Sequence, residues 1–143
     1  MRFVRPIILA ALLAGLAACA GDGNKSDSLY GRLGERAGIA KVVDDFTARV
    51  AADNRINRFF AKTDIPAFKR HLTDQLCQAS GGPCVYKGRS MQESHKGMNI
   101  SVQEFNWTGG HLAAALNAAG VAPADRDAVL SVAGSLQKDI VGQ

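Results

Sequence analysis

The sequence lacks most of the short motifs that identify an enzyme class. It contains no G-x-S-x-G nucleophile elbow, no glycine-rich phosphate loop between a strand and a helix, and no pair of histidines at metal-binding spacing. It also has no basic run with interleaved aromatic residues, which argues against nucleic acid as a partner. Histidine is scarce, with three residues in a chain of 143, so each can be considered individually.

Residues 1–18 have the layout of a secretion signal. Arg2 and Arg5 precede the apolar run IILAALLAGLAA, and small residues follow up to Cys19. The apolar run is too short to be a good membrane span. The stretch LAAC, which ends at Cys19, resembles a bacterial lipobox, in which the cysteine is diacylated and becomes the first residue of the mature protein. An ordinary signal peptide with an incidental cysteine is the alternative.

This interpretation divides the chain into three parts. They are a lipoprotein signal peptide (1–18), a flexible tether rich in glycine, serine and aspartate (19–27), and one domain (28–143). We expect a lipid-anchored protein of the bacterial envelope that faces the periplasm. Ala20 is not the aspartate associated with inner-membrane retention, which favours the outer membrane. Loss of Arg2 and Arg5 leaves 15 basic and 13 acidic residues, a net charge of +2, so charge gives no argument for nucleic-acid binding.

The domain shows helical periodicity and no persistent strand alternation, which predicts an all-α fold of about six helices. Three start signals support this: Asp64 is a candidate N-cap, and S-x-x-E capping boxes begin at Ser90 and Ser101. NRINRFF predicts a short helix that delivers Phe59 and Phe60 inward. Short helices make a thin core, to which a bound apolar cofactor would add buried area. The predicted apolar stripes are Ile39, Val42, Val43, Phe46 and Val50; Ile65, Phe68, Leu72, Leu76 and Ala79; Val102, Phe105, Leu112 and Leu116; and Val129, Val132, Leu136 and Ile140.

Two cysteines remain once Cys19 is assigned to the lipid. Cys77 and Cys84 would be able to pair in an oxidising compartment, whereas in cytosol they would stay thiols. Three interpretations stay open for this pair: a disulfide, two free thiols, or a metal or redox site. The last needs a tighter pair or more ligands than CQASGGPC provides.

Each histidine has a structural and a functional interpretation. His95 ends a short helix, where it is either a partly exposed cap or a neutral imidazole that binds a metal or haem iron. Met91 and Met98 flank it and suit the wall of a flat apolar cofactor. His71 is either a boundary residue or faces the same cavity from an opposing helix. His111 we interpret as structural, on the polar flank of its helix.

The sequence resembles the group I truncated haemoglobins over Ser28 to Val141. The resemblance rests on LYGRLG, VVDDFTARVAADNRINRFF, GGPCVYKGRSMQESH and GHLAAALNAAGV, which match in order and spacing. It implies a compressed globin fold, two helix pairs stacked on each other, with haem b between them and His95 as the proximal iron ligand. The implied pocket residues are Phe46, Thr47, Phe59, Phe60, Phe68, Leu72, Tyr86, Met91, Met98 and Phe105.

The departures from this family bear on ligand chemistry. Most relatives carry Phe-Tyr where this chain has Phe46 and Thr47, and many carry glutamine where it has Leu72. Some use a histidine at the position of His71 as a second, distal iron ligand. A hydrogen bond to bound oxygen is worth roughly 1.5 to 3 kcal/mol, about ten- to a hundredfold in retention. Oxygen should therefore leave quickly unless His71 supplies the bond.

We expect a haem protein that binds O2, NO or CO reversibly, for oxygen binding or nitric oxide detoxification with an unknown reductase. A nitric oxide dioxygenase or peroxidase-like activity stays open, and we expect a monomer. A six-coordinate bis-histidine electron-transfer or sensor protein, with His71 opposite His95, is the main alternative. A haem-free envelope lipoprotein that uses the helical fold as an interaction module is a third.

Overall fold

The computed structural model describes residues 27–143, so the predicted signal peptide, Cys19 and the predicted tether before Asp27 lie outside the described part. Within this range the chain is helical, with one isolated bridge between Ile100 and Val141 and no strand, which confirms the all-α prediction. No helix among these residues is long and apolar enough to cross a membrane. The elements are α1 (Leu29–Arg32), α2 (Glu35–Ala52), η2 (Asn57–Phe60), α3 (Ile65–Ala79), α4 (Met91–His95), α5 (Val102–Ala118), α6 (Pro123–Ser135) and η3 (Gln137–Asp139).

Helix α2 is the centre of the fold. Its predicted apolar stripe is confirmed, because all five members are at most 5% exposed. The helix packs against both α3 and α5, so it buries apolar side chains on two sides. The buried members of the stripe are Ile39, Val42, Val43, Phe46 and Val50.

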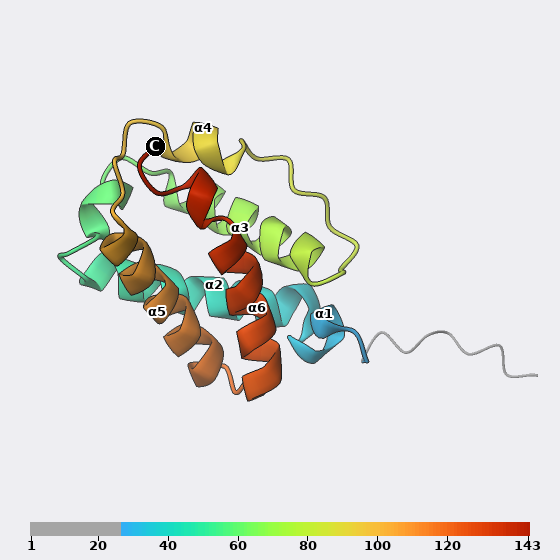
Figure 1. The fold of residues 1–143 in the computed structure, drawn as a ribbon. Helices are drawn as coiled ribbons and strands as arrows, with labels where there is room; N and C mark the ends of the chain where they lie inside the picture. The colour runs from blue at the N-terminus through green and yellow to red at the C-terminus, as the bar shows by residue number, and fades with distance from the viewer. Residues whose placement is uncertain (1–26) are drawn as a thin grey trace, which may run out of the picture.

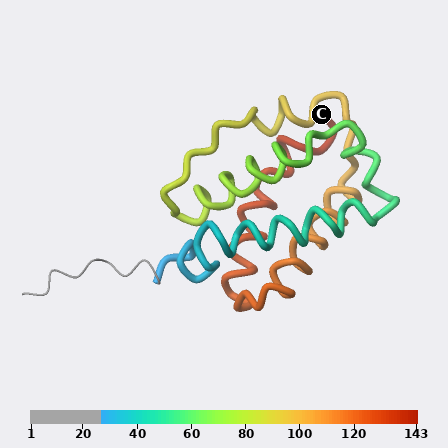
Figure 2. The backbone as a smooth tube through the Cα atoms, turned by 180° about the vertical axis from the view of Figure 1, so that it is seen from behind, coloured from blue at the N-terminus to red at the C-terminus, as the bar shows by residue number. Residues whose placement is uncertain are grey.

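The helices form two pairs. Helix α3 lies beside α2, and α6 lies beside α5, which crosses α2 (Figures 1 and 2). This arrangement confirms the two-over-two helical sandwich. The short helix α4 lies at one side of the molecule and faces α3 (Figure 1). The segment from residue 80 to 90 connects the two helices.

All three predicted start signals act as helix caps. The Asp64 side chain accepts from the amide of Ala67 at 2.9 Å and begins α3. Complete capping boxes begin α4 at Ser90 and α5 at Ser101, because in each the serine and the glutamate three positions later satisfy each other's amide. Helix α2 begins at Glu35, after Gly34 in the left-handed region (φ 79°), four residues before Ile39, the first member of its predicted stripe.

The predicted stripe of the last helix is wrong at its end. Helix α6 ends at Ser135, where Leu136 forms the cap, and the chain continues as the tighter helix η3. Only Val129 of this stripe joins the buried core, and Val132 is 39% exposed. Val102 is likewise 51% exposed in the first turn of α5. Periodicity alone does not show which turns of a helix have a partner to pack against.

Candidate functional site

His95 is the last residue of α4, and its ring is held by its own helix. Nδ1 lies 2.7 Å from the carbonyl oxygen of Met91, one helical turn earlier. A carbonyl oxygen only accepts, so Nδ1 carries the proton, and in the neutral ring Nε2 then carries the lone pair. This is the tautomer that a metal-binding histidine needs, and a backbone carbonyl is a usual partner for the opposite ring nitrogen.

Helix α4 forms locally but packs extensively on no other helix. Its capping box explains how a helix of only five residues can form. Within this box the Ser90 amide donates to the Glu93 carboxyl and lowers its pKa. Single contacts fix its position: the Gln75 amide reaches the Met91 sulfur at 3.6 Å, and Gln92 donates to Asp139 at 3.1 Å. Helix α4 is therefore a wall that stands apart from the core.

Helix α3 supplies the opposite wall. The fully buried residues of this helix are Thr73 and Cys77, whereas Phe68, Leu72 and Leu76 of the predicted stripe are only half-buried against the core. Met91 and Met98, which lie close to His95 in the sequence, are half-buried as well. A flat apolar group between the two walls would complete the burial of both sets.

His71 lies on the face of α3 that meets the segment before α4. Its ring contacts the ring of Tyr86 edge-on, with centroids 6.1 Å apart. The His71 side chain is exposed, and within the described part of the chain no hydrogen bond to it is found. Tyr86 is fixed, because its amide donates to Gln78 at 2.6 Å and its hydroxyl donates to the Arg89 carbonyl at 2.8 Å. Burial raises the pKa of Tyr86.

The remaining predicted pocket residues differ in burial. Phe46 and Thr47 belong to the buried interior of α2, at 5% and 9% exposure. The Thr47 hydroxyl donates to the Val43 carbonyl at 2.6 Å, so its only proton is already used within the helix. The rings of Phe60 and Phe68 meet edge-on at 5.5 Å. Phe59, Phe60, Phe68, Leu72, Tyr86, Met91, Met98 and Phe105 are all half-buried.

Gln75 and Gln78 are residues that sequence reasoning missed. They follow His71 by one and two helical turns, so all three side chains occupy one face of α3. Gln75 contacts Met91, and Gln78 contacts Tyr86. The signal was present as an i, i+4, i+7 row, but polar residues on a helix surface usually face only water.

Cys77 and Cys84 are joined by a disulfide, which ties the C-terminal part of α3 to the segment that carries Tyr86. Gly82 stands inside this turn, where a Cβ atom would come within 2.7 Å of the Cys77 sulfur and 2.5 Å of the Tyr30 ring. A side chain at Gly82 would therefore push the segment away from the core. Arg36 approaches the Cys84 sulfur at 3.2 Å and pairs with Asp74 at 2.6 Å.

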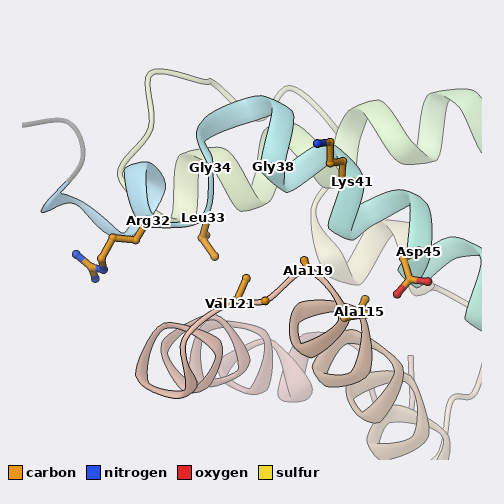
Figure 3. Close-up of a pocket in the computed structure, with 11 residues that line it drawn as sticks. Arg32, Leu33, Gly34, Gly38, Lys41, Asp45, Ala115, Ala119 and Val121 are labelled. Atoms are coloured by element: carbon orange, nitrogen blue, oxygen red, sulfur yellow. The ribbon is translucent and has the colours of Figure 1, made fainter.

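A separate cavity of about 450 Å³ lies between the start of α2 and the end of α5 (Figure 3). Small residues such as Gly38, Ala115 and Ala119 line it, and Arg32 and Lys41 lie at its edges. It contains none of the predicted site residues. Groups of three or more residues that could hold a bare metal ion do not occur within residues 27–143.

Comparison with known proteins gives a consistent result. Residues 28–141 match the family model described as bacterial-like globin. The chain is 36% identical over 120 residues to a group 1 truncated haemoglobin of Tetrahymena pyriformis, which covers 84% of this chain and 99% of that protein. It is 38% identical over 94 residues to a group 1 truncated haemoglobin of Mycolicibacterium paratuberculosis, covering 66% of this chain and 69% of that protein.

Solved structures agree with the sequence matches. The Fe(III) form of the Tetrahymena pyriformis truncated haemoglobin superimposes with a TM-score of 0.78 at 35% identity, covering 81% of this chain and 99% of that one. The 2/2 haemoglobin of Synechococcus, in the cyanomet state with covalently attached haem, superimposes with a TM-score of 0.74 at 32% identity, covering 80% and 98%.

Proposed function

The chain belongs to the group 1 truncated haemoglobin family and its cofactor is haem, and on that premise we propose that His95 is the proximal iron ligand of a reversible binder of diatomic gases. One observation carries the assignment of His95. Its Nδ1 proton is donated to the Met91 carbonyl, which leaves the Nε2 lone pair available to the iron. The bound haem supplies an iron atom with one further position for O2, NO or CO.

The residues of this chain fit such a group. Half-buried Phe68, Leu72 and Leu76 on α3, together with Met91 and Met98 beside His95, would contact its two faces and exclude water. Phe59 and Phe60 of η2, and Phe105 of α5, would close one side. In this proposal Tyr86 is a positioning residue, because its ring contacts His71 and two hydrogen bonds fix it.

Ligand retention is expected to be weak for oxygen. The Thr47 hydroxyl already donates to the Val43 carbonyl, and the Leu72 side chain has no donor. Neither residue therefore offers a hydrogen bond to a bound ligand. A missing hydrogen bond of roughly 1.5 to 3 kcal/mol favours rapid oxygen release. We therefore favour nitric oxide detoxification, with electrons from a reductase, over oxygen storage.

A bis-histidine redox or sensor protein is the second candidate. His71 favours it, since its ring is exposed, lies on the face of α3 turned toward the segment before α4, and is hydrogen-bonded to no described residue. In this candidate the His71 imidazole would be the second protein ligand of the haem iron. Low-spin bands in the resting protein that disappear in His71→Ala would select this candidate.

The cellular site is also a proposal. The signal-like layout of residues 1–18 and the LAAC stretch that ends at Cys19 support a lipid anchor in the envelope, with the domain in the periplasm. A Cys19→Ser variant should leave the membrane fraction. Wild type and variant in the same soluble fraction would contradict the lipid anchor without touching the haem assignment.

Optical spectra of the ferric and ferrous protein, with and without carbon monoxide, test the main proposal. We expect a sharp Soret band that shifts when carbon monoxide binds to the ferrous form. A folded, colourless protein that takes up no haem would overturn it and would select the haem-free interaction module.

A further inference from the structure

The positive charge of the described chain is concentrated in one segment. Residues 61–98 run out along α3 and back along α4 (Figures 1 and 2), and we call them the α3–α4 hairpin. The hairpin holds six basic and three acidic side chains, a net charge of +3. The other described residues, 27–60 and 99–143, hold eight basic and nine acidic side chains, a net charge of −1.

Ion pairing increases this contrast. Outside the hairpin, six of the eight basic side chains form ion pairs, all of them arginines. Inside it, Lys69 pairs with Asp44 at 3.1 Å. Among the residues that the structure describes, five further hairpin cations are exposed and form no ion pair: Lys62, Arg70, Lys87, Arg89 and Lys96.

None of the three acidic side chains of the hairpin forms an ion pair with these five cations. Asp74 pairs with Arg36 on α2, and Asp64 caps α3. Glu93 closes the capping box of α4. Glu93 also interacts electrostatically with Arg89, but the hairpin as a whole keeps its net charge of +3 and projects a positive field.

The same hairpin carries both candidate iron ligands, His71 and His95. The five cations therefore belong to the same segment as the two histidines that would face the haem in the proposed function. Haem carries two propionates, which can pair with two of the five cations. At least three cations stay available to another negatively charged surface.

We propose that Lys62, Arg70, Lys87, Arg89 and Lys96 form a docking surface for an acidic electron-donor protein. This inference rests on the proposed function, because the donor acts on haem iron held by the hairpin. In each encounter one electron passes from the donor's redox group to ferric iron; the donor is oxidised by one electron, the iron becomes ferrous, and no bond is made or broken between the proteins. Complementary charge speeds such encounters and orients them.

An anionic membrane would attract the same charges, but the hairpin fits it less well. Surface-bound helices bury apolar side chains in the lipid as well as contacting its headgroups. Val85 is the one large apolar side chain of the described hairpin that is mostly exposed, at 64%. A protein partner needs no such insertion, so the observations favour it.

The test compares two double variants of equal charge. Lys87→Gln/Lys96→Gln removes two lysines from the surface. Lys41→Gln/Lys138→Gln removes the two exposed lysines of residues 27–60 and 99–143 that form no ion pair. The probe is an acidic flavodoxin. Its affinity is measured by calorimetry, and the reduction of the ferric protein by flavodoxin hydroquinone is measured by stopped flow. Dithionite serves as a small reductant for comparison.

At low ionic strength the hairpin double variant should bind flavodoxin about tenfold more weakly than wild type and be reduced by it about tenfold more slowly, as expected for about two lost contacts. Both differences should vanish near 0.5 M salt, because exposed charges are then screened. The control double variant should stay within about twofold of wild type. Reduction by dithionite should be equal in all three proteins.

Equal losses in both double variants would overturn the proposal, since total charge alone would then explain them. A loss of binding to phosphatidylglycerol vesicles that exceeds the loss of flavodoxin binding would assign the surface to the membrane instead. The Soret band and carbon monoxide complex are measured first. A wild type without haem overturns the proposed function itself, whereas normal spectra without flavodoxin binding overturn only the docking surface.

Discussion

The Nε2 atom of His111 lies 2.7 Å from Oδ2 of Asp53, which joins α5 to the C-terminal end of α2. Asp53 also accepts from the Arg55 side chain at 2.6 and 2.8 Å, and the Arg55 guanidinium lies 4.4 Å from the centre of the Trp107 ring. Two helix layers are therefore linked through one carboxylate. This geometry agrees with the structural interpretation of His111.

Acid should remove the stability that this link contributes to the fold. Hydrogen bonds from Arg55 and then His111 hold the pKa of Asp53 far below its ordinary value. A lowered folded-state pKa contributes stability above the ordinary pKa of about 4, and this contribution is lost as pH falls below it. Asp53→Asn should therefore lower the thermal midpoint at pH 7 and reduce its fall between pH 5 and pH 3.

Asp127→Asn is the matched control, because its ion pair with Arg126 lies on the surface with 63% of the aspartate exposed. It should change neither the midpoint at pH 7 nor the acid transition by a measurable amount. If both variants show the same profile as wild type, the Asp53 link contributes nothing to acid stability.

The sequence predicted the parts of the fold that are decided locally or by a continuous apolar stripe. The caps at Asp64, Ser90 and Ser101 form within four residues, and the stripe of α2 has a partner on two sides. The prediction for Val132 was wrong, because the exposure of a side chain depends on whether another element covers that turn of the helix. The periodicity of the sequence does not show this.

The candidate site was only partly predictable for the same reason. His95 could be predicted from its place after a capping box and from the family resemblance. The hydrogen bond from the Thr47 hydroxyl to the Val43 carbonyl could not, because it depends on the backbone geometry of α2. Gln75 and Gln78 contact residues 16 and 8 positions later, so their role depends on how the hairpin folds back. The spacing of Cys77 and Cys84 left three chemistries open.

His95→Gly should abolish tight haem retention. The variant removes the proposed Nε2 ligand and leaves the walls of the pocket in place, and haem that binds only the folded state adds its binding free energy to stability. We expect transfer of haem to apomyoglobin at least tenfold faster than from wild type, and a lower thermal midpoint. Millimolar imidazole should restore the Soret position, because it replaces the missing ligand without the covalent tether.

Unchanged haem transfer and unchanged spectra in His95→Gly would show that another residue holds the iron. His71→Ala provides the comparison. It should retain haem and bind carbon monoxide, since the proximal bond is intact, so the two histidines are distinguished by one pair of measurements.

Thr47→Tyr should slow the release of oxygen. The threonine hydroxyl is committed to the Val43 carbonyl, whereas a tyrosine hydroxyl reaches beyond its own helix. A new hydrogen bond of roughly 1.5 to 3 kcal/mol would slow dissociation by about ten- to a hundredfold in stopped flow. Thr47→Phe controls for the larger ring, because it fills the same space without a donor. Equal rates for tyrosine and phenylalanine would mean that residue 47 does not face the ligand.

Protein isolated from its native cells should contain no free thiol at Cys77 or Cys84. The disulfide closes a short loop between α3 and the segment that carries Tyr86, and such a cross-link stabilises a fold by about 2 to 3 kcal/mol through the lost freedom of the unfolded chain. Cys77→Ala/Cys84→Ala should lose this amount in chemical denaturation, and the chemically reduced wild type should lose the same. Because Tyr86 contacts His71, both should also alter the spectrum of the resting ferric protein if His71 ligates the iron. Labelling of both cysteines in denaturant without prior reductant would show that the native protein carries two thiols, and the stability difference should then vanish.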